Sequence, residues 1–248
     1  DIQPAPAAPA TGYWRGVFSR LLRDKVTVVC ALVILAMILM ALFAPWIAPE
    51  DPLKSSILKR LKPIGTEGYP LGTDELGRDM LSRLIFGARL SLVMGIVPVL
   101  SALAIGGLLG ITAGFMGGRT NTAIMRAIDV FYAFPSVLLA VAISGALGAG
   151  IVNAIVSLTI VFIPPIARVT ESVTTQVRSL DYVEAARASG AGSFTIIRVH
   201  ILGNVMGPVF IYATGLLSVC MILAAGLSFL GLGTKPPQPE WGLMLNML

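Results

Sequence analysis

The sequence has few charged residues for its length. Only 12% of its 248 residues are Asp, Glu, Lys or Arg, whereas 56% are hydrophobic, and the mean hydropathy is +0.85. Water-soluble domains carry about 25% charged residues. A chain this apolar cannot hide its hydrophobic surface in one water-soluble core, so we expect an all-α integral membrane protein.

Residues that build catalytic, nucleotide and metal sites are also scarce or isolated. The single histidine, His200, and the two cysteines, Cys30 and Cys220, lie apart from one another, so we expect no metal site and no disulfide. The chain has no phosphate-binding Gly-x-x-x-x-Gly-Lys-[Ser/Thr] loop, no Gly-x-Ser-x-Gly and no His-Glu-x-x-His. We therefore expect no enzyme activity and no cofactor in this chain, and any energy must come from another polypeptide.

Apolar segments long enough to cross a bilayer, about 20 residues each, give the expected fold. We predict a polytopic helical bundle in which a stretch broken at Pro164-Pro165 forms the fourth span. A further apolar start at 241–248 indicates a sixth span missing at the C-terminus. The five predicted spans are 26–47, 90–116, 127–147, 151–169 and 207–230.

Basic residues at the ends of these segments predict the orientation. Arg15, Arg20, Arg23 and Lys25 precede the first span, so the N-terminus should be cytoplasmic. By alternation, the basic segment 168–204 also lies inside and 48–89 lies outside. The net charge of +5 therefore reflects topology, not nucleic-acid binding. The Pro/Ala-rich residues 1–14 are expected to be a disordered tail.

Residues 181–190 form a polar helical stretch between apolar segments. Asp181 is the expected N-cap, with Glu184 completing a capping box, and Ser193 should cap the next helix. Ala185 and Ala186 favour helix, Ser189 follows them, and Gly190 suits a left-handed C-terminal position. Such a helix can seat in a groove of a partner, although an ordinary interfacial loop is the alternative.

Three further features concern packing and the outer face. Small residues at four-residue spacing, Gly106, Gly110 and Gly114 among them, predict close helix packing in the second span. Asp129 lies three residues after Arg126, which favours an ion pair on one helix over a substrate contact. Residues 71–92 are expected to form an amphipathic helix at the outer interface, either an anchor or a docking surface.

Three motifs resemble those of ABC importer permeases of the dipeptide, oligopeptide and nickel family. The first is Glu184-Ala185-Ala186 with Gly190 and the apolar close at Ile201-Leu202, which is similar to the loop that contacts the ATPase. The second is Leu71-Gly-Thr-Asp-Glu-Leu-Gly-Arg-Asp-Met-Leu-Ser-Arg83, and the third is the external segment 225–242. The chain looks like the second of the two permease subunits.

The resemblance implies a type I importer permease fold, with a first span and outer loop in 15–70 and a permease core in 71–248. It implies a coupling helix at 181–190 whose ATPase contacts include Asp181, Glu184, Ala185, Ala186, Ser189 and Gly190. It also implies an inner-membrane location, a second homologous permease, two ATPase subunits that hold ATP and Mg, and an external binding protein. Peptides are the expected substrate, with nickel chelates, glutathione or opines as alternatives.

A self-sufficient secondary carrier or channel is the rival hypothesis. It would need charges in mid-membrane or inverted repeats with broken helices, and the sequence shows no convincing repeat. A membrane enzyme is weaker still, because no catalytic set is visible. Purification distinguishes an importer subunit from a carrier, since the importer subunit should co-isolate with ATPases and a carrier should work alone.

Overall fold

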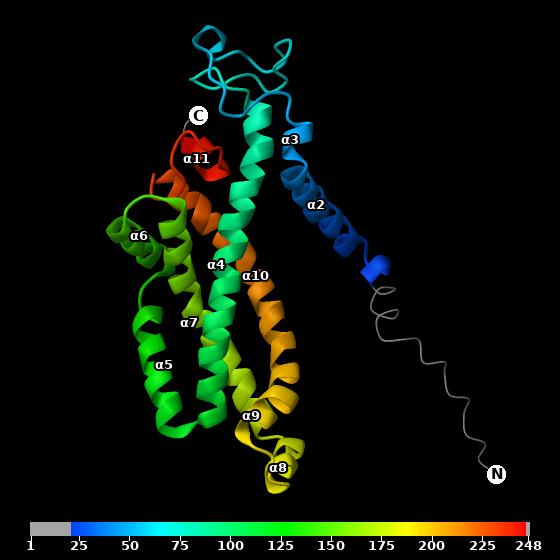
Figure 1. Ribbon diagram of the computed structural model, residues 1–248, viewed down its shortest axis with the longest axis vertical. Helices are drawn as coiled ribbons and strands as arrows, with labels where there is room; N and C mark the ends of the chain where they lie inside the picture. The colour runs from blue at the N-terminus through cyan, green and yellow to red at the C-terminus, as the bar shows by residue number, and fades with distance from the viewer. Residues whose placement is uncertain (1–20, 247–248) are drawn as a thin grey trace, which may run out of the picture.

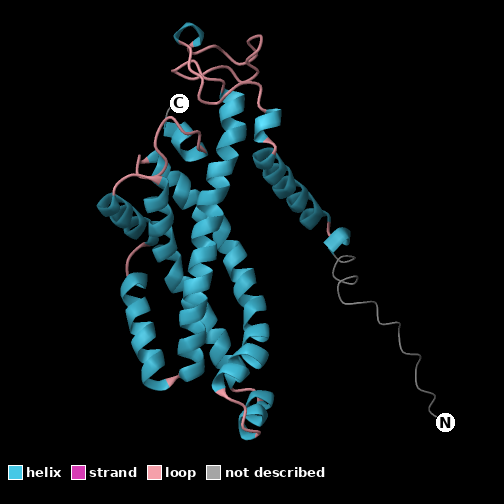
Figure 2. Ribbon diagram, in the orientation of Figure 1, coloured by secondary structure: helices cyan, strands magenta, loops and turns pink. Residues whose placement is uncertain are grey.

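The computed structural model describes residues 21–246, which form an elongated bundle of helices (Figure 1). Within those residues the backbone consists of helices and loops with no extended strand (Figure 2). A 3₁₀ turn, η1 (Ile57–Lys59), and a π-helical turn, η2 (Ile197–Ile201), interrupt the loops and the last long helix. The α-helices are α2 (Lys25–Leu42), α3 (Ala44–Ile47), α4 (Met80–Met116), α5 (Gly118–Tyr132), α6 (Ser136–Leu147), α7 (Ile151–Arg178), α8 (Asp181–Ala188), α9 (Ser193–Ile196), α10 (Leu202–Phe229) and α11 (Trp241–Asn246).

Among residues 21–246, four helical stretches are long and apolar enough to cross a membrane: α2, α4, α7 and the run from Ser193 to Phe229. The pair α5 and α6 makes a fifth span if it is counted as one, and it is bent by 85°. This confirms the expected polytopic helical fold. The third span was wrongly predicted as one helix over 127–147. Pro135 lacks an N–H and adopts an extended conformation, so the chain breaks between Tyr132 and Ser136.

The two prolines of α7 do not break it, contrary to the prediction. Pro164 and Pro165 lie inside one continuous helix from Ile151 to Arg178. Pro164 is buried together with Ile166 and Ala167, so neighbouring helices hold the segment in place. Membrane helices tolerate proline in such packed surroundings. The first span is also shorter than predicted, because α2 ends at Leu42 and the chain turns at Phe43 before α3.

The core forms where α4 packs along α7, with α10 against both (Figure 1). Met94, Leu158 and Ile166 are fully buried at its centre. Gly106, Gly110 and Gly114 allow the two backbones to approach, since a Cβ on Gly110 would lie 2.6 Å from the carbonyl oxygen of Ala167. Close backbone approach of this kind is how small residues join helices in lipid. The α4–α7 pair is therefore the central unit of the fold.

Two consecutive glycines turn the chain from α4 into α5. Gly117 and Gly118 have φ values of 65° and 52°, in the left-handed region that favours glycine. The Arg178 guanidinium, from the last turn of α7, fills the space beside Gly117. It donates hydrogen bonds to the carbonyl oxygens of Gly114 (3.2 Å) and Phe115 (2.9 Å). A cation thus satisfies the free carbonyls at the C-terminus of α4.

Residues 48–79 fold into a cap at the N-terminal end of α4 (Figure 1), which we call the outer cap after the side of the membrane predicted for it. The amphipathic helix predicted from residue 71 was wrong, because 71–79 form turns and α4 begins at Met80. Gly72 and Gly77 hold φ values of 74° and 71°, and a Cβ at either would collide with backbone of 56–64. These turns fold the chain back on itself instead of continuing the helix.

Candidate functional site

Helix α8 lies at the end of the bundle opposite the outer cap (Figure 1). Val183, on the side of α8 that faces the bundle, is fully buried and belongs to the hydrophobic core. Its neighbour Tyr182 accepts a hydrogen bond from Asn204 Nδ2 (3.1 Å), and the Tyr182 ring lies 5.9 Å from the ring of His200. The helix is therefore fixed to the start of the last span and presents its other side outward.

The predicted capping box at the start of α8 is wrong. Leu180 is the N-cap residue and Asp181 is the first helical residue, with no side-chain hydrogen bond capping the helix. Asp181 and Glu184 instead place two carboxylates in the first turn, where they interact favourably with the helix dipole. Ser193 is likewise the first residue of α9, and Gly192 takes the cap position.

The C-terminus of α8 is a Schellman motif. Gly190 has φ +83°, which confirms its predicted left-handed conformation. Its N–H donates to the carbonyl of Arg187 (3.0 Å), and the N–H of Ala191 donates to the carbonyl of Ala186 (3.1 Å). Backbone hydrogen bonds thus define the turn after α8, and Ser189 Oγ adds one to the carbonyl of Ala185 (2.9 Å).

The predicted partner-contact residues of α8 do not all face outward. Asp181, Glu184, Ala185, Ser189 and Gly190 are exposed. Ala186 is half-buried and packs against the core. Of the predicted contacts, the accessible ones are therefore two carboxylates, one alanine and the Ser189–Gly190 turn. The exposed surface of α8 also includes residues that were not predicted: Tyr182, Arg187 and Ala188.

At the other end of the molecule, a buried ion network joins the outer cap to α4. Asp74 accepts from Arg78 Nε (2.7 Å) and lies 3.5 Å from Arg83 Nε, and all three side chains are almost fully buried. Asp79 caps α4 by accepting from the N–H of Ser82 (2.8 Å). Sequence reasoning had placed these residues on an exposed amphipathic face, and their burial is a correction. The turns at Gly72 and Gly77 fold the charges inward.

Arg83 also joins segments that are distant in the sequence. Its Nη1 atom donates to the carbonyl oxygens of Pro52 and Pro237, each at 3.3 Å. Nearby, Glu240 is 1% exposed and accepts from Ser91 Oγ (3.2 Å) and from the N–H of Leu243 (2.9 Å). Sequence analysis missed both roles, although the two residues fall within motifs that it had singled out.

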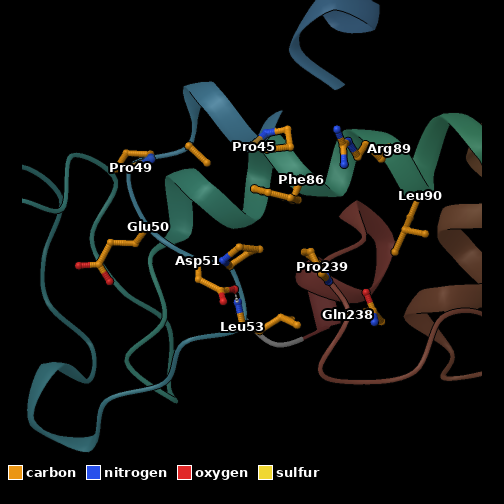
Figure 3. Close-up of a pocket in the computed structure, with 12 residues that line it drawn as sticks. Pro45, Pro49, Glu50, Asp51, Leu53, Phe86, Arg89, Leu90, Gln238 and Pro239 are labelled. Atoms are coloured by element: carbon orange, nitrogen blue, oxygen red, sulfur yellow. Dashed lines mark hydrogen bonds between the residues drawn. The ribbon is translucent and has the colours of Figure 1, made fainter. Parts of the chain in front are cut away.

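A cavity of about 700 Å³ opens beside this network, between α3, the cap, α4 and the segment before α11 (Figure 3). Its walls are mostly prolines and apolar side chains, with Arg89 at one side. Arg89 Nη2 donates to the carbonyl of Leu42 (2.9 Å) and so anchors the end of α2. On the cap itself, the hydrogen bond from Lys59 Nζ to Tyr69 Oη raises the pKa of Lys59, which keeps this amine charged.

An exposed ion pair joins the last turn of α5, just before its bend into α6, to α7. Asp129 Oδ1 accepts from Arg168 Nη2 of α7 at 2.6 Å, so the predicted pairing with Arg126 is wrong. The Arg168 guanidinium also lies 4.4 Å from the centre of the Tyr132 ring. Within residues 21–246, no three His, Cys, Asp or Glu side chains gather as a metal site.

Together these features define a class: a multi-pass membrane transport subunit with an outer cap at one end and an exposed helix at the other. Residues 106–248 match the family of binding-protein-dependent transport system inner membrane components. Residues 12–63 match the N-terminal transmembrane domain of oligopeptide transport permease C. The chain belongs to this family of ABC importer permeases, whose members are membrane subunits and not themselves enzymes.

Curated relatives support the same assignment. The chain is 46% identical over 219 residues to the di/tripeptide transport system permease of Pseudomonas aeruginosa, covering 86% of this chain and 72% of the relative. It is 40% identical over 233 residues to the glutathione transport system permease of Pectobacterium atrosepticum, covering 94% and 77%. It is 37% identical over 252 residues to the dipeptide permease of Alkalihalophilus pseudofirmus, covering 99% and 83%.

Among solved structures, the chain resembles the inward-facing MetNI methionine ABC transporter. One crystal form gives a TM-score of 0.56 at 23% identity, covering 62% of this chain and 77% of that one. A second, native form gives 0.55 at 25% identity with the same coverage. These matches show the shared permease fold.

Proposed function

We propose that this chain is the permease subunit of an ATP-driven importer of di- and tripeptides. The observation that carries the proposal is the 46% identity to a di/tripeptide permease, which extends over 86% of the chain. Glutathione is the second candidate substrate, because the glutathione permease is 40% identical over 94% of the chain. Both candidates are small peptides with free charged ends.

In this proposal, one homologous permease completes the translocation pathway and two ATPase subunits, which hold ATP and Mg, bind the cytoplasmic side. The outward side of α8 is the ATPase contact, supported by its exposure and by the Schellman turn that fixes its shape. ATP binding draws the two ATPases together and displaces α8. Contacts that differ between the two arrangements then shift the bundle between inward-open and outward-open states.

An external binding protein delivers the peptide to the outer cap. The cap exposes apolar side chains that no other part of the described chain covers: Leu58 is 95% exposed, Ile57 84% and Ile64 79%. Exposed apolar side chains gathered on one lobe are typical of protein contact surfaces. In this proposal the outer cap lies on the external side of the inner membrane, and α8 and the N-terminus lie in the cytoplasm.

Purification and uptake test the proposal. The tagged chain, expressed with its neighbouring transport subunits, should co-isolate with ATPases and with a second permease. Cells that carry the complex should take up alanyl-alanine in an ATP-dependent manner, and cells without this chain should not. Peptide uptake by the chain alone, with no ATPase bound, would instead support a secondary carrier.

A further inference from the structure

The ion pair between Asp129 and Arg168 lies at an unusual place for charge. Arg168 is 17 residues along α7 from Ile151, which at 1.5 Å per residue is about 26 Å from the outer end of that helix. The hydrocarbon core of a bilayer is about 30 Å thick, so the pair lies just inside the core, about one helical turn from its cytoplasmic edge. Charges at such a depth are costly and are usually turned towards protein or a water-filled path.

The pair is nevertheless not buried inside this subunit. The Arg168 side chain is 46% exposed and that of Asp129 is 47% exposed. A pair that only held α5 to α7 would be expected between the helices. Asn121 Nδ2 and Glu171 Oε1 already make such a contact at 2.6 Å, nearer the cytoplasmic ends of the same two helices. The Asp129–Arg168 pair therefore faces a space that this chain leaves open.

Much of the pair's binding capacity is unused. A guanidinium has five N–H donors, and Arg168 uses one of them, on Nη2, to reach Asp129 Oδ1. Asp129 Oδ2 accepts no hydrogen bond from any of residues 21–246. The Tyr132 ring lies 4.4 Å from the Arg168 guanidinium and makes a cation–π contact with it. The geometry leaves donors for a carboxylate and an oxygen for an ammonium group.

A cavity of about 260 Å³ adjoins the pair. Tyr132, which touches Arg168, is part of its wall, as are Ser136 at the start of α6 and Pro164 and Pro165 of α7. Leu216 and Val219 of α10 close the other side. The walls are apolar and aromatic apart from Ser136 and the Tyr132 hydroxyl, and Tyr132 connects this wall to the Arg168 guanidinium.

We propose that Asp129 and Arg168 form a transient binding site for the two charged ends of a free peptide passing this cavity. Arg168 binds the C-terminal carboxylate, Asp129 binds the N-terminal ammonium, and the resting ion pair between them opens as the peptide exchanges with it. The site rests on the proposed function, and it gives that function a substrate class: zwitterionic peptides with both ends free.

Cysteine protection tests the site in the assembled complex without ATP or binding protein. Cys30 and Cys220 are first replaced by serine and alanine, and Ser136→Cys then places one thiol on the cavity wall. Alanyl-alanine should slow maleimide labelling of this thiol, whereas N-acetyl-alanyl-alanine amide, with both ends neutral, should not. Equal protection by both peptides, or by neither, would overturn the proposal.

Variants then test whether Asp129 and Arg168 cause the protection of the thiol. Arg168→Gln should weaken protection by alanyl-alanine about tenfold, the usual scale for losing a charged hydrogen bond. Asp129→Asn should weaken it less, since a neutral amide oxygen still accepts. Arg126→Gln is the control. It also removes one arginine charge, one turn from Asp129 on α5, and should leave protection by alanyl-alanine unchanged. Where Arg168→Gln fails to assemble, Arg168→Lys keeps the cation but loses the planar fork, and protection should still weaken.

Full protection in an assembled Arg168→Gln complex would refute the site. Uptake of alanyl-alanine by cells, measured in parallel, distinguishes failure of the peptide-end site from failure of the proposed importer function. If cells take up alanyl-alanine but the free and end-blocked peptides protect the thiol equally, only the proposed site is wrong. If no peptide is taken up at all, the proposed function itself is wrong.

Discussion

At the residue scale, Gly190 and Gly110 are required for different reasons, one for its backbone conformation and the other for its small size. Gly190 is needed for its backbone conformation, because φ +83° is strained for other residues while the space beside it is open. Gly110 is needed for its size, since a Cβ there would lie 2.5 Å from Thr170 Cβ and 2.6 Å from the Ala167 carbonyl oxygen. Substitutions at the two sites should therefore fail in different ways.

Gly190→Val should preserve assembly and abolish coupling. The cost is backbone strain of about 1–2 kcal/mol at a left-handed position, which distorts the turn after α8 without touching the spans. We expect a complex that assembles but neither imports peptide nor raises its ATPase rate with loaded binding protein. Gly192→Ala is the matched control, since Gly192 has φ −69° and open space around it. Full transport by Gly190→Val would show that this conformation is not required.

Gly110→Val should instead destabilise the bundle. The added side chain forces α4 away from α7, and overpacking of this kind costs about 1–3 kcal/mol. The melting temperature of the purified complex should fall. Gly107→Ala, three residues earlier on α4, meets nothing within 4 Å and should leave it unchanged. An unaltered melting temperature for Gly110→Val would mean that the helices separate there without cost.

At the element scale, α8 has one buried and one exposed side. Val183 and the half-buried Ala186 face the bundle, whereas Ala185 and Ser189 face outward. The structure therefore narrows the set of positions that a partner can reach, and Ala186 is a poor probe of the contact.

A cysteine at Ser189 should crosslink to an ATPase subunit in the assembled complex. One at Val183, on the buried side of the same helix, should not. The readout is a shifted band that contains both polypeptides after treatment with a short bifunctional maleimide. Reaction of the Ser189→Cys thiol only with soluble reagent, in a complex known to hold its ATPases, would argue against α8 as the coupling helix.

At the scale of the whole molecule, α4 extends from the outer cap to the end of the bundle where α8 lies (Figure 1). Its 37 residues extend about 55 Å, well beyond a hydrocarbon core of about 30 Å. Its first turns adjoin the outer cap. There Arg83 binds Pro52 of the cap and Pro237 of the segment before α11, and Ser91 accepts a hydrogen bond from the N–H of Trp241 in α11. Its last turn is bound by Arg178. The outer cap and α8 thus belong to one continuous framework.

The orientation of this framework can be measured directly. In a chain lacking Cys30, a cysteine at the exposed Glu67 of the cap should react with a membrane-impermeant maleimide in intact cells. A cysteine at the exposed Ser193 should react only after lysis. The reverse pattern would invert the topology and place α8 outside.

Local patterns predicted the spans and the turn at Gly190, because hydropathy and glycine conformation depend on neighbours in the sequence. The pairing of Asp129 was wrong because Arg126 is close in sequence, whereas Arg168 is 39 residues away and brought near only by the packing of α5 on α7. The burial of Arg83 depends on a carbonyl 154 residues away. The sharpness of the 85° turn next to Pro135 could not be predicted, because composition reports that a segment is apolar and not how its direction changes.

Arg178 has a mechanical consequence. It is the last residue of α7, and α8 begins three residues later at Asp181. Its guanidinium is bonded to the final turn of α4, and the glycines that follow carry the chain straight into α5. Only a short segment therefore connects α8 to the residue that is hydrogen-bonded to the α4–α5 turn. If α8 is the ATPase contact proposed above, we expect a displacement of α8 to move α4 and α7 together, and α5 with them up to its bend near Pro135.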